Sequence, residues 1–183
     1  MERTVNAEIT IRQANEIDTN GLFDLNNKFQ FHLDRKVEQQ KTGFLLNAPL
    51  SKADFSRIIK NEEIVVACCG DRVVGYFLVD TCSDTPNLVH SKQELKTLIS
   101  LHVIPGHLKI APRAQVVIDA DFQKSGIYKQ LIGSLASLIR GKFDGILGIV
   151  AKNNPKLMAH EKVGWTVVKE DNDWFYVLYH LSA

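Results

Sequence analysis

Apolar and polar residues follow one another in patterns that predict alternating strands and helices along the chain. Residues 8–13 (EITIRQ) set Ile9 and Ile11 between polar neighbours, as in a half-buried strand. From residue 20 to about residue 40, apolar side chains recur every three or four positions, the spacing of one helical face, with room for a single break. They are Leu22, Leu25, Phe29, Leu33 and Val37. We expect this face to pack on a sheet.

The next segments predict a short helix and then a hairpin. Ser51 and Asp54 have the spacing of a capping box, so a helix should begin there and end near Lys60. Residues 63–69 (EIVVACC) and 72–80 (RVVGYFLVD) are rich in β-branched and aromatic residues, and a Gly-Asp pair separates them. This pattern is typical of two antiparallel strands joined by a tight turn.

The second half of the chain predicts helices that alternate with strands. Ser91 and Glu94 again have capping-box spacing, before a helix that Pro105 and Gly106 would stop, and residues 102–112 should form a loop. The remaining segments should be a strand, a helix, a strand, a short helix and a closing antiparallel pair, at residues 113–119, 125–140, 145–151, 155–163, 165–170 and 173–180. The strand–helix–strand order implies parallel strands.

Composition narrows the class of protein. The 183 residues fit one domain, 1–183, and 45% hydrophobic residues are enough for a packed core. A formal charge of +1 without a basic run does not favour nucleic acid as a partner. The apolar stretches are far shorter than the ~18 residues of a membrane helix, and the first residues do not resemble a secretory signal, so we expect a cytoplasmic protein. Cys68, Cys69 and Cys82 lack metal-ligand spacing and are expected as core residues.

Residues 116–131 (VVIDADFQKSGIYKQL) carry the strongest indication of chemistry. Here a strand passes through Gln123, Lys124, Ser125 and Gly126 into a helix. The start of a helix has unsatisfied N–H donors and partial positive charge, so it can hold a pyrophosphate, and glycine lets the phosphates approach the backbone. On these residues alone, an ordinary strand-to-helix turn is the alternative.

The same segment resembles the GCN5-related N-acetyltransferase family. The acyl-CoA signature of that family, Arg/Gln-x-x-Gly-x-Gly/Ala after a strand, is matched by Gln123, Lys124, Ser125, Gly126, Ile127 and Tyr128. Upstream, residues 118–122 look like the end and bend of the family's strand. Downstream, residues 151–165 (AKNNPKLMAHEKVGW) resemble its Asn-containing strand end, short helix and Gly-aromatic ending, and the order of elements over residues 8–181 agrees.

The resemblance implies both a fold and a cofactor. The fold would be of the α/β (α+β) class: a mixed, mostly antiparallel sheet of about seven strands, flanked by helices and splayed between its fourth and fifth strands. The cofactor would be acetyl-CoA, with the pyrophosphate of coenzyme A over Gln123–Tyr128 and the pantetheine arm bonded to the backbone of Val116 and Ile118. No metal is implied.

Two positions depart from the family pattern, and one more is carried over. Tyr128 stands where Gly or Ala is usual, and it is either a contact for phosphate or adenine or an ordinary aromatic on the first turn. His160, four positions before Gly164, stands where many members carry the Tyr that protonates the leaving thiolate. It is either that acid or an exposed helix residue. Asn153 is expected near the cofactor, with a simple helix cap as the alternative.

The activity implied is transfer of an acetyl group to a primary amine by direct attack in a ternary complex. A base is not identifiable, and only water relays to Glu62, Glu63, His102 or His107 suggest themselves. The acceptor, a small molecule or a protein amine, stays open among polyamine, antibiotic, amino acid and protein.

The apolar residues before the second predicted strand and before the fourth have two interpretations. They can line an acceptor pocket, or they can pack helices on the sheet, which we favour. They are Phe44, Leu45, Leu46, Val103 and Ile104.

The sequence is also compared with two other functions and with one mode of self-association. A non-catalytic acyl-CoA-binding or protein-interaction module is the main alternative, because the usual Tyr and a strand-four carboxylate are missing. A dinucleotide enzyme is disfavoured, because no GxGxxG follows the first strand. Residues 174–181 are a candidate edge for a homodimer.

Overall fold

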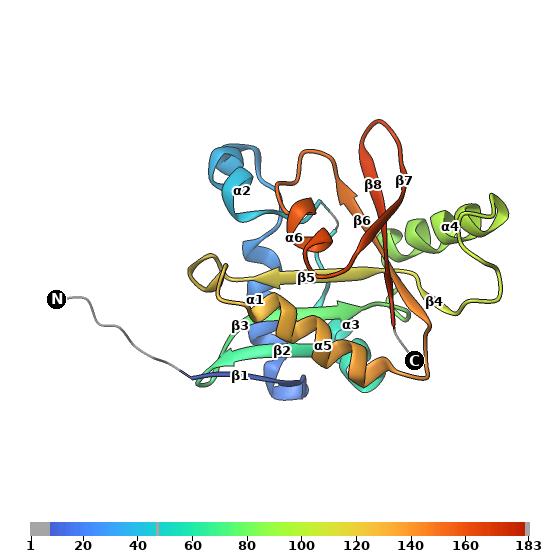
Figure 1. Cartoon of the computed structure of the whole chain (residues 1–183). Helices are drawn as coiled ribbons and strands as arrows, with labels where there is room; N and C mark the ends of the chain where they lie inside the picture. The colour runs from blue at the N-terminus through green and yellow to red at the C-terminus, as the bar shows by residue number, and fades with distance from the viewer. Residues whose placement is uncertain (1–7, 47, 182–183) are drawn as a thin grey trace.

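Strands of the protein form two four-stranded sheets with helices around them (Figure 1). The computed structural model describes residues 8–46 and 48–181. The strands are β1 (Ile9–Gln13), β2 (Ile64–Cys69), β3 (Arg72–Val79), β4 (Ile110–Ala111), β5 (Ala114–Ile118), β6 (Gly145–Ala151), β7 (Thr166–Glu170) and β8 (Trp174–His180). The α-helices are α1 (Thr19–Lys28), α2 (Lys36–Thr42), α3 (Lys52–Lys60), α4 (Pro86–Ser100), α5 (Ile127–Ile139) and α6 (Leu157–Glu161).

The sheets separate between β5 and β6, where the fourth and fifth predicted strands were expected to splay. One sheet has the order β1-β2-β3-β5 and the other β4-β6-β8-β7. The named strands pair antiparallel except for β4 with β6. The expectation of a mostly antiparallel, splayed sheet flanked by helices is therefore confirmed.

Two predictions about the strands were wrong. Ile110 and Ala111 form β4 inside the segment expected as a loop, because they pair with Gly145 and Ile146, a contact that local sequence does not reveal. The strand–helix–strand order also implied that β5 and β6 pair in parallel. They do not form a hydrogen-bonded pair, since they belong to different sheets. In the described chain, β6 takes the short β4 as its parallel neighbour instead.

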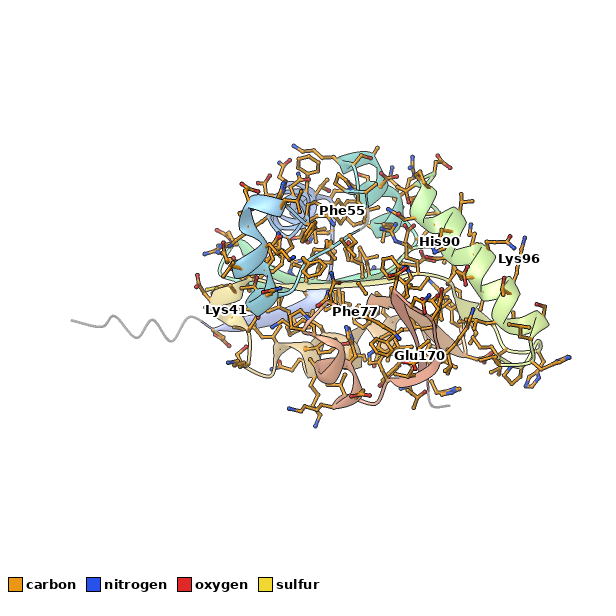
Figure 2. All side chains as sticks on the ribbon, turned by 90° about the horizontal axis from the view of Figure 1, so that it is seen from above. Lys41, Phe55, Phe77, His90, Lys96 and Glu170 are labelled. Carbon is orange, nitrogen blue, oxygen red and sulfur yellow. The ribbon has the colours of Figure 1, made fainter. Side chains whose placement is uncertain are left out.

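Helices cover the two faces of the first sheet. Helices α1 and α3 pack on one face, where Phe55 and Tyr76 are fully buried. Helix α5 packs on the other face against Phe77, and the same apolar cluster continues into β6 and β8. Figure 2 shows Phe55 and Phe77 on opposite sides of this sheet. Helix α5 therefore covers the first sheet, and its buried face belongs to an apolar cluster that includes residues of both sheets.

The predicted helical face of residues 20–40 holds only in its first half. Leu22, Leu25 and Phe29 are buried, but Leu33 and Val37 are 81% and 75% exposed. The helix ends after Lys28, so the helical period is interrupted and α2 begins in a new phase. A polar clamp fixes α2 instead, in which Gln39 is buried, donates to the carbonyl of Gln30 (2.6 Å) and accepts the N–H of His32 (3.0 Å).

The two predicted capping boxes had opposite outcomes. Ser51 and Asp54 cap α3 reciprocally, as expected. Ser91 does not start a helix, because α4 already begins at Pro86, with Thr85 as its N-cap. A Thr-Pro pair is itself a helix-start signal, since proline is favoured in the first turn, and it outweighs the Ser91–Glu94 spacing.

The closing hairpin forms as predicted, but its role at the sheet edge differs. Strand β8 lies between β6 and β7, so residues 174–181 do not offer a free edge, and the edge beside them is β7. Of the three free cysteines, Cys68 is buried in the core and the other two are half-buried. Within residues 8–46 and 48–181, no helix is long and apolar enough to cross a membrane, and no cluster of three metal-ligating side chains occurs.

Candidate functional site

The turn between β5 and α5 has the backbone shape of an anion-binding loop. A short 3-10 turn (Ala120–Phe122) leads into the turn, in which Lys124 and Gly126 have positive φ angles of 65° and 82°. Gly126 is the N-cap, and no side chain caps the helix there. The first N–H groups of α5 have no partner within the helix and are directed out of its start. A β-carbon on Gly126 would meet no atom within 4 Å, so the space over the loop is open.

A cleft of about 420 Å³ opens beside this loop. Its wall contains Val116, Ile118, residues 42–45 and all of the predicted phosphate loop, Gln123–Tyr128, except Ser125. The exposed Ser125 hydroxyl donates instead to the carbonyl of Phe122. Four lysines line the cleft, namely Lys124, Lys129, Lys156 and Lys162, and none of its lining residues is Asp or Glu. The local charge is therefore positive although the whole chain is nearly neutral, which favours an anionic ligand.

Gln123 contributes its side chain to the interior of the cleft. Its amide donates to the carbonyls of Thr42 (2.9 Å) and Ile118 (3.0 Å) and accepts from Nζ of Lys156 (2.8 Å). The backbone N–H of Gln123 donates to the carbonyl of Ala120 (3.3 Å). This N–H was expected to be free for a phosphate, but it already has a partner. Burial lowers the pKa of Lys156, and the neighbouring Lys124 lowers it further.

The edge of β5 that faces β6 is the edge expected to meet the cofactor. The backbone N–H of Asp119 donates to the carbonyl of Val74 (2.8 Å), and the backbone N–H of Asp80 donates to the carbonyl of Arg113 (2.9 Å). Backbone groups alternate in direction along a strand, so the odd-numbered residues of β5 bond to β3. The backbone groups of Val116 and Ile118 are therefore directed toward the gap between the sheets.

Three adjacent clefts lie along this gap, and we call this row of clefts the passage. A narrow hollow of about 90 Å³ shares Phe44, Leu45, Val116 and Asn154 with the large cleft. On its other side it shares Leu46, Ala114, Ile149 and Trp174 with a third cleft of about 150 Å³ beside α4. The passage therefore runs from the phosphate loop, between β5 and β6, to the surface of α4.

Tyr128 and His160 form a hydrogen-bonded pair in the wall of this passage. The Tyr128 hydroxyl lies 2.5 Å from Nδ1 of His160, and the two rings meet edge to face. Phe77 packs against the Tyr128 ring and Trp165 against the His160 ring. Burial lowers the pKa of His160 to about 4 and raises the pKa of Tyr128, so both groups are uncharged near neutral pH.

Comparison with solved structures identifies the architecture. No family model matches the sequence, and no curated protein matches it. A GNAT-family acetyltransferase of Listeria monocytogenes superposes with a TM-score of 0.65 at 15% identity, covering 96% of each chain. The chain has the GCN5-related N-acetyltransferase fold.

Two further structures of this acetyltransferase fold were solved with ligands. The PaiA N-acetyltransferase of Thermoplasma acidophilum, in complex with coenzyme A, has a TM-score of 0.61 at 12% identity, over 94% of this chain and 99% of that one. The yncA protein of Salmonella typhimurium, with its cofactor acetyl-CoA, has a TM-score of 0.62 at 13% identity, over 96% and 95%. The similarity covers nearly the whole length of each protein.

Within this acetyltransferase fold, the asparagine that reaches the passage is Asn154 rather than Asn153. The side chain of Asn153 is exposed and is not part of the cleft walls. The chain turns after β6, and the N–H of Asn154 donates to the carbonyl of Ala151 (2.9 Å), which directs the second asparagine inward. The Asn154 amide donates to the carbonyl of Phe44 (3.0 Å) and accepts the N–H of Lys156 (3.1 Å).

Other candidate residues lie partly inside and partly outside the passage. Phe44, Leu45 and Leu46 line it, whereas Ile104 is buried in a separate cluster against α4. Five side chains considered from the sequence are not among the residues that line the three clefts, namely Glu62, Glu63, His102, His107 and Val103.

Sequence reasoning missed several wall residues. The missed residues converge from separate elements and are Lys129, Lys156 and Lys162 of the large cleft, together with Arg113, Gln115 and Trp174. The one local signal that could have found a member of this group is the polar pair Arg113 and Gln115 at the start of an otherwise apolar strand.

Proposed function

We propose that this protein is an N-acetyltransferase that transfers an acetyl group from acetyl-CoA to a primary amine. The observation that carries the proposal is the loop before α5, with its outward N–H groups and open space over Gly126, set in a lysine-lined cleft. An anion held by backbone donors and by lysines fits the pyrophosphate of coenzyme A. The ligands named for the yncA and PaiA structures agree with this choice.

Coenzyme A would lie along the passage from its basic end. The pyrophosphate would sit over Lys124–Tyr128, and the pantetheine arm would run beside β5, using backbone groups of Val116 and Ile118. Asn154 would take the role that the sequence assigned to Asn153. The thioester would then reach the narrow hollow of about 90 Å³, and the amine would approach from the α4 side.

The transfer is a direct displacement at the thioester carbonyl carbon. The amine nitrogen forms a bond to this carbon, and the carbon–sulfur bond then breaks with its electron pair going to sulfur. The amine loses one proton to solvent, and the sulfur leaves as a thiolate that takes up one proton. Backbone N–H groups at the gap would stabilise the negative charge that develops on the carbonyl oxygen.

Tyr128 and His160 would together supply the proton to sulfur. His160 lies in the wall of the narrow hollow and Tyr128 in the wall of the large cleft, so the pair stands where the two meet. Because the pKa of His160 is about 4, the ring is neutral and is not itself the acid. The Tyr128 hydroxyl would give its proton to the sulfur and take one up again from solvent, while the hydrogen bond to His160 holds that hydroxyl in place. A pair from two elements would thus replace the single tyrosine of the family.

Substitution of Gly126 by aspartate tests the cofactor site. Gly126→Asp would place a carboxylate over the phosphate position, so binding of coenzyme A should be lost. Gly141→Asp is the matched control, because Gly141 has nearly the same φ angle (81°) and the same open surroundings but lies beyond the other end of α5.

The readout is thermal unfolding with and without coenzyme A or acetyl-CoA. A ligand at 100 times its Kd stabilises the native state by about 2.7 kcal/mol, which raises the midpoint visibly. We expect the rise in the wild type and in Gly141→Asp but not in Gly126→Asp. An equal rise in all three proteins would remove the cofactor from this loop.

A non-catalytic acyl-CoA-binding module is the second candidate. It is favoured by one observation, that the three clefts of the described chain are lined by no Asp or Glu that could act as a base. Coenzyme A binding without turnover of any amine would support it. Turnover of any amine, measured as release of free coenzyme A, would exclude it.

A further inference from the structure

Two buried side chains at the α4 end of the passage have donors without partners. Arg113 and Gln115 are each 3% exposed. Nε and Nη2 of Arg113 and Nε2 of Gln115 are buried and have no hydrogen-bond partner among the described residues. Unpaired buried donors are costly, and they commonly mark a position that a ligand or ordered water fills.

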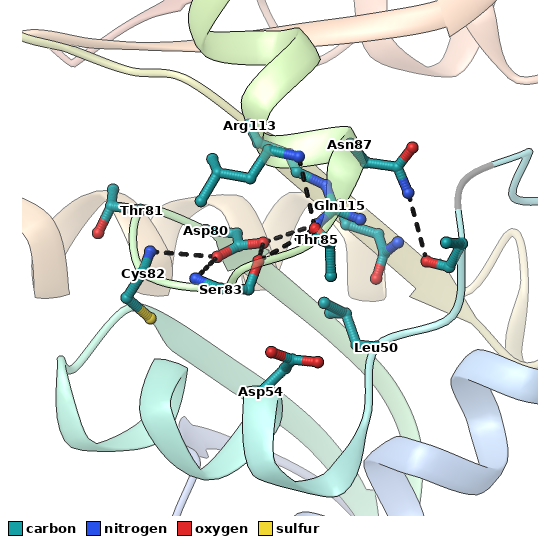
Figure 3. A network of polar contacts seen from close by, with 12 residues as sticks. Leu50, Asp54, Asp80, Thr81, Cys82, Ser83, Thr85, Asn87, Arg113 and Gln115 are labelled. Atoms are coloured by element: carbon teal, nitrogen blue, oxygen red, sulfur yellow. Dashed lines mark hydrogen bonds and ion pairs between the residues drawn. The ribbon is translucent and has the colours of Figure 1, made fainter.

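The hydrogen bonds that Arg113 and Gln115 do form show which of their atoms are paired and which donors remain free. Nη1 of Arg113 donates to Asp80 (2.6 Å) and to Thr85 (3.2 Å), as Figure 3 shows. Asp80 also accepts from Ser83 and from the N–H of Cys82, so its oxygens are directed into the protein. Oε1 of Gln115 accepts from Asn26 (2.9 Å) and Tyr76 (2.7 Å).

The free donors of Arg113 have the geometry of a carboxylate site. Nε–H and the adjacent N–H of Nη2 form one edge of the planar guanidinium, on which two carboxylate oxygens fit side by side. The Gln115 amide adds a third donor. Arg113 directly precedes β5, and its carbonyl continues the pairing with the β3 side by accepting the N–H of Asp80. Arg113 and Gln115 are two positions apart in this extended segment, so their side chains lie on the same side of it.

Arg113 and Gln115 lie at the end of the passage from which the amine would approach. Arg113 lines the third cleft and Gln115 the narrow hollow, and both clefts are lined by Ala114, Ile149 and Trp174. The same walls contain no Asp or Glu, so the described residues offer no counter-charge to a second cationic group of a polyamine.

We propose that the acceptor is an amine that also carries a carboxylate, such as an amino acid, and that the Arg113 edge and the Gln115 amide bind that carboxylate. The inference rests on the proposed acetyl transfer and names its substrate class. The apolar wall of Leu147, Ile149 and Trp174 would receive the rest of the molecule. The proposal selects one among the acceptors that the sequence left open.

The test compares the twenty L-amino acids with their α-carboxamides and with spermidine, each with acetyl-CoA, by release of coenzyme A. We expect at least one amino acid to be acetylated with kcat/KM at least tenfold above its carboxamide. Carboxamides or spermidine that react as well as the acids would overturn the proposal while leaving the acetyltransferase intact. Failure of coenzyme A to stabilise the protein would instead overturn the proposed function.

Two substitutions address the site itself. Arg113→Lys keeps a positive charge for Asp80 but removes the planar fork. Gln115→Glu keeps an oxygen for Asn26 and Tyr76 but replaces the free N–H donors with oxygen. Both should raise KM for the amino acid at least tenfold, with the KM for acetyl-CoA unchanged.

Controls keep this test decisive. Stabilisation by coenzyme A shows that each variant is folded, and the loss of kcat/KM for the amino acid should exceed the loss for its carboxamide at least tenfold. Equal losses for acid and carboxamide would overturn the carboxylate site. If no amino acid is acetylated, and none raises the unfolding midpoint of the coenzyme A complex, the unpaired donors serve ordered water and the proposal is wrong.

Discussion

Burial determines the protonation state of His160, and with it what this side chain can do in the proposed proton transfer. An exposed histidine changes charge near pH 6.5, but the rings of Tyr128 and Trp165 enclose this one, and its pKa falls to about 4. The sequence left two alternatives for His160, an acid at the reaction centre or an exposed helix residue. The packed rings, which come from α5, α6 and the segment before β7, instead keep the imidazole neutral.

This shift predicts that the stability of the protein depends on pH. The native state favours neutral His160, whereas the unfolded chain protonates it near pH 6.5, so the unfolded state binds more protons between about pH 6.5 and 4. Unfolding free energy should therefore fall as pH falls through that window, with His160 contributing on the order of 3 kcal/mol. Chemical denaturation at pH 7 and pH 4.5 measures it.

Two substitutions separate this contribution from other groups. His160→Gln should reduce the loss of stability between the two pH values, because glutamine does not titrate. His90→Gln, on the exposed surface of α4, should leave the loss as it is in the wild type. The interpretation fails if both variants show the wild-type dependence.

The Tyr128 hydroxyl should matter for turnover more than for binding. Tyr128→Phe keeps the ring that packs on Phe77 but removes the group that bonds His160. General acids contribute typically 10²–10⁴-fold, so we expect kcat to fall about 10²-fold with the Kd for coenzyme A within threefold. Steady-state kinetics and calorimetry measure the two. A variant with unchanged kcat would assign the proton transfer to another group.

At the scale of elements, α5 has two functions that depend on one another. Its first turn ends the predicted phosphate loop, and Leu131, Leu135 and Ile139 on its buried face belong to an apolar cluster that includes residues of both sheets. The loop is consequently held in place by the packing of the whole helix. A cavity under the helix should therefore weaken both the fold and the site.

Leu135→Ala is the corresponding prediction. Leu135 is completely buried, and such truncations cost about 2–5 kcal/mol. Denaturant unfolding should show that loss, and coenzyme A should bind more weakly to the variant. Ser137→Ala, on the exposed side of the same helix, should change stability by less than about 1 kcal/mol. Similar values for the two variants would contradict the role given to the helix.

Elements fixed by neighbouring residues were predictable from sequence, and elements fixed by distant partners were not. The Ser51–Asp54 cap and the β2–β3 hairpin depend on a few adjacent residues and formed as expected. Strand β4 exists only through its pairing with β6. Local periodicity likewise could not show that α1 ends before Leu33, or that β8 lies inside its sheet.

The site divides in the same way. The predicted phosphate loop lies in one continuous segment, and its glycine and its position before a helix are the local features that predict it. The free N–H donors of Arg113 and Gln115 become significant only in the folded protein, where they are buried without partners. Asn153 and Asn154 are adjacent in the turn after β6, and sequence spacing alone does not show which of the two side chains lines the passage.

At the scale of the whole molecule, the gap between the sheets leaves the β6-facing edge of β5 without a neighbouring strand among the described residues. Along β5, Val117 bonds toward β3, whereas Val116 and Ile118 have their backbone groups directed at the passage. A pantetheine arm in this gap would act as an additional strand between the two sheets. Ligand binding should therefore change backbone protection in an alternating pattern that a general increase in stability would not produce.

Hydrogen exchange of backbone amides tests this pattern. In the free protein the Val116 N–H should exchange much faster than the Val117 N–H, which lies in the β3 ladder. Saturating coenzyme A should slow Val116 at least tenfold more than it slows Val117, because only Val116 gains a new partner. The Gly126→Asp variant, in which the pyrophosphate is excluded, should lose the difference. Equal slowing of the two amides would mean that the ligand stabilises the fold from elsewhere and that the gap between β5 and β6 does not hold it.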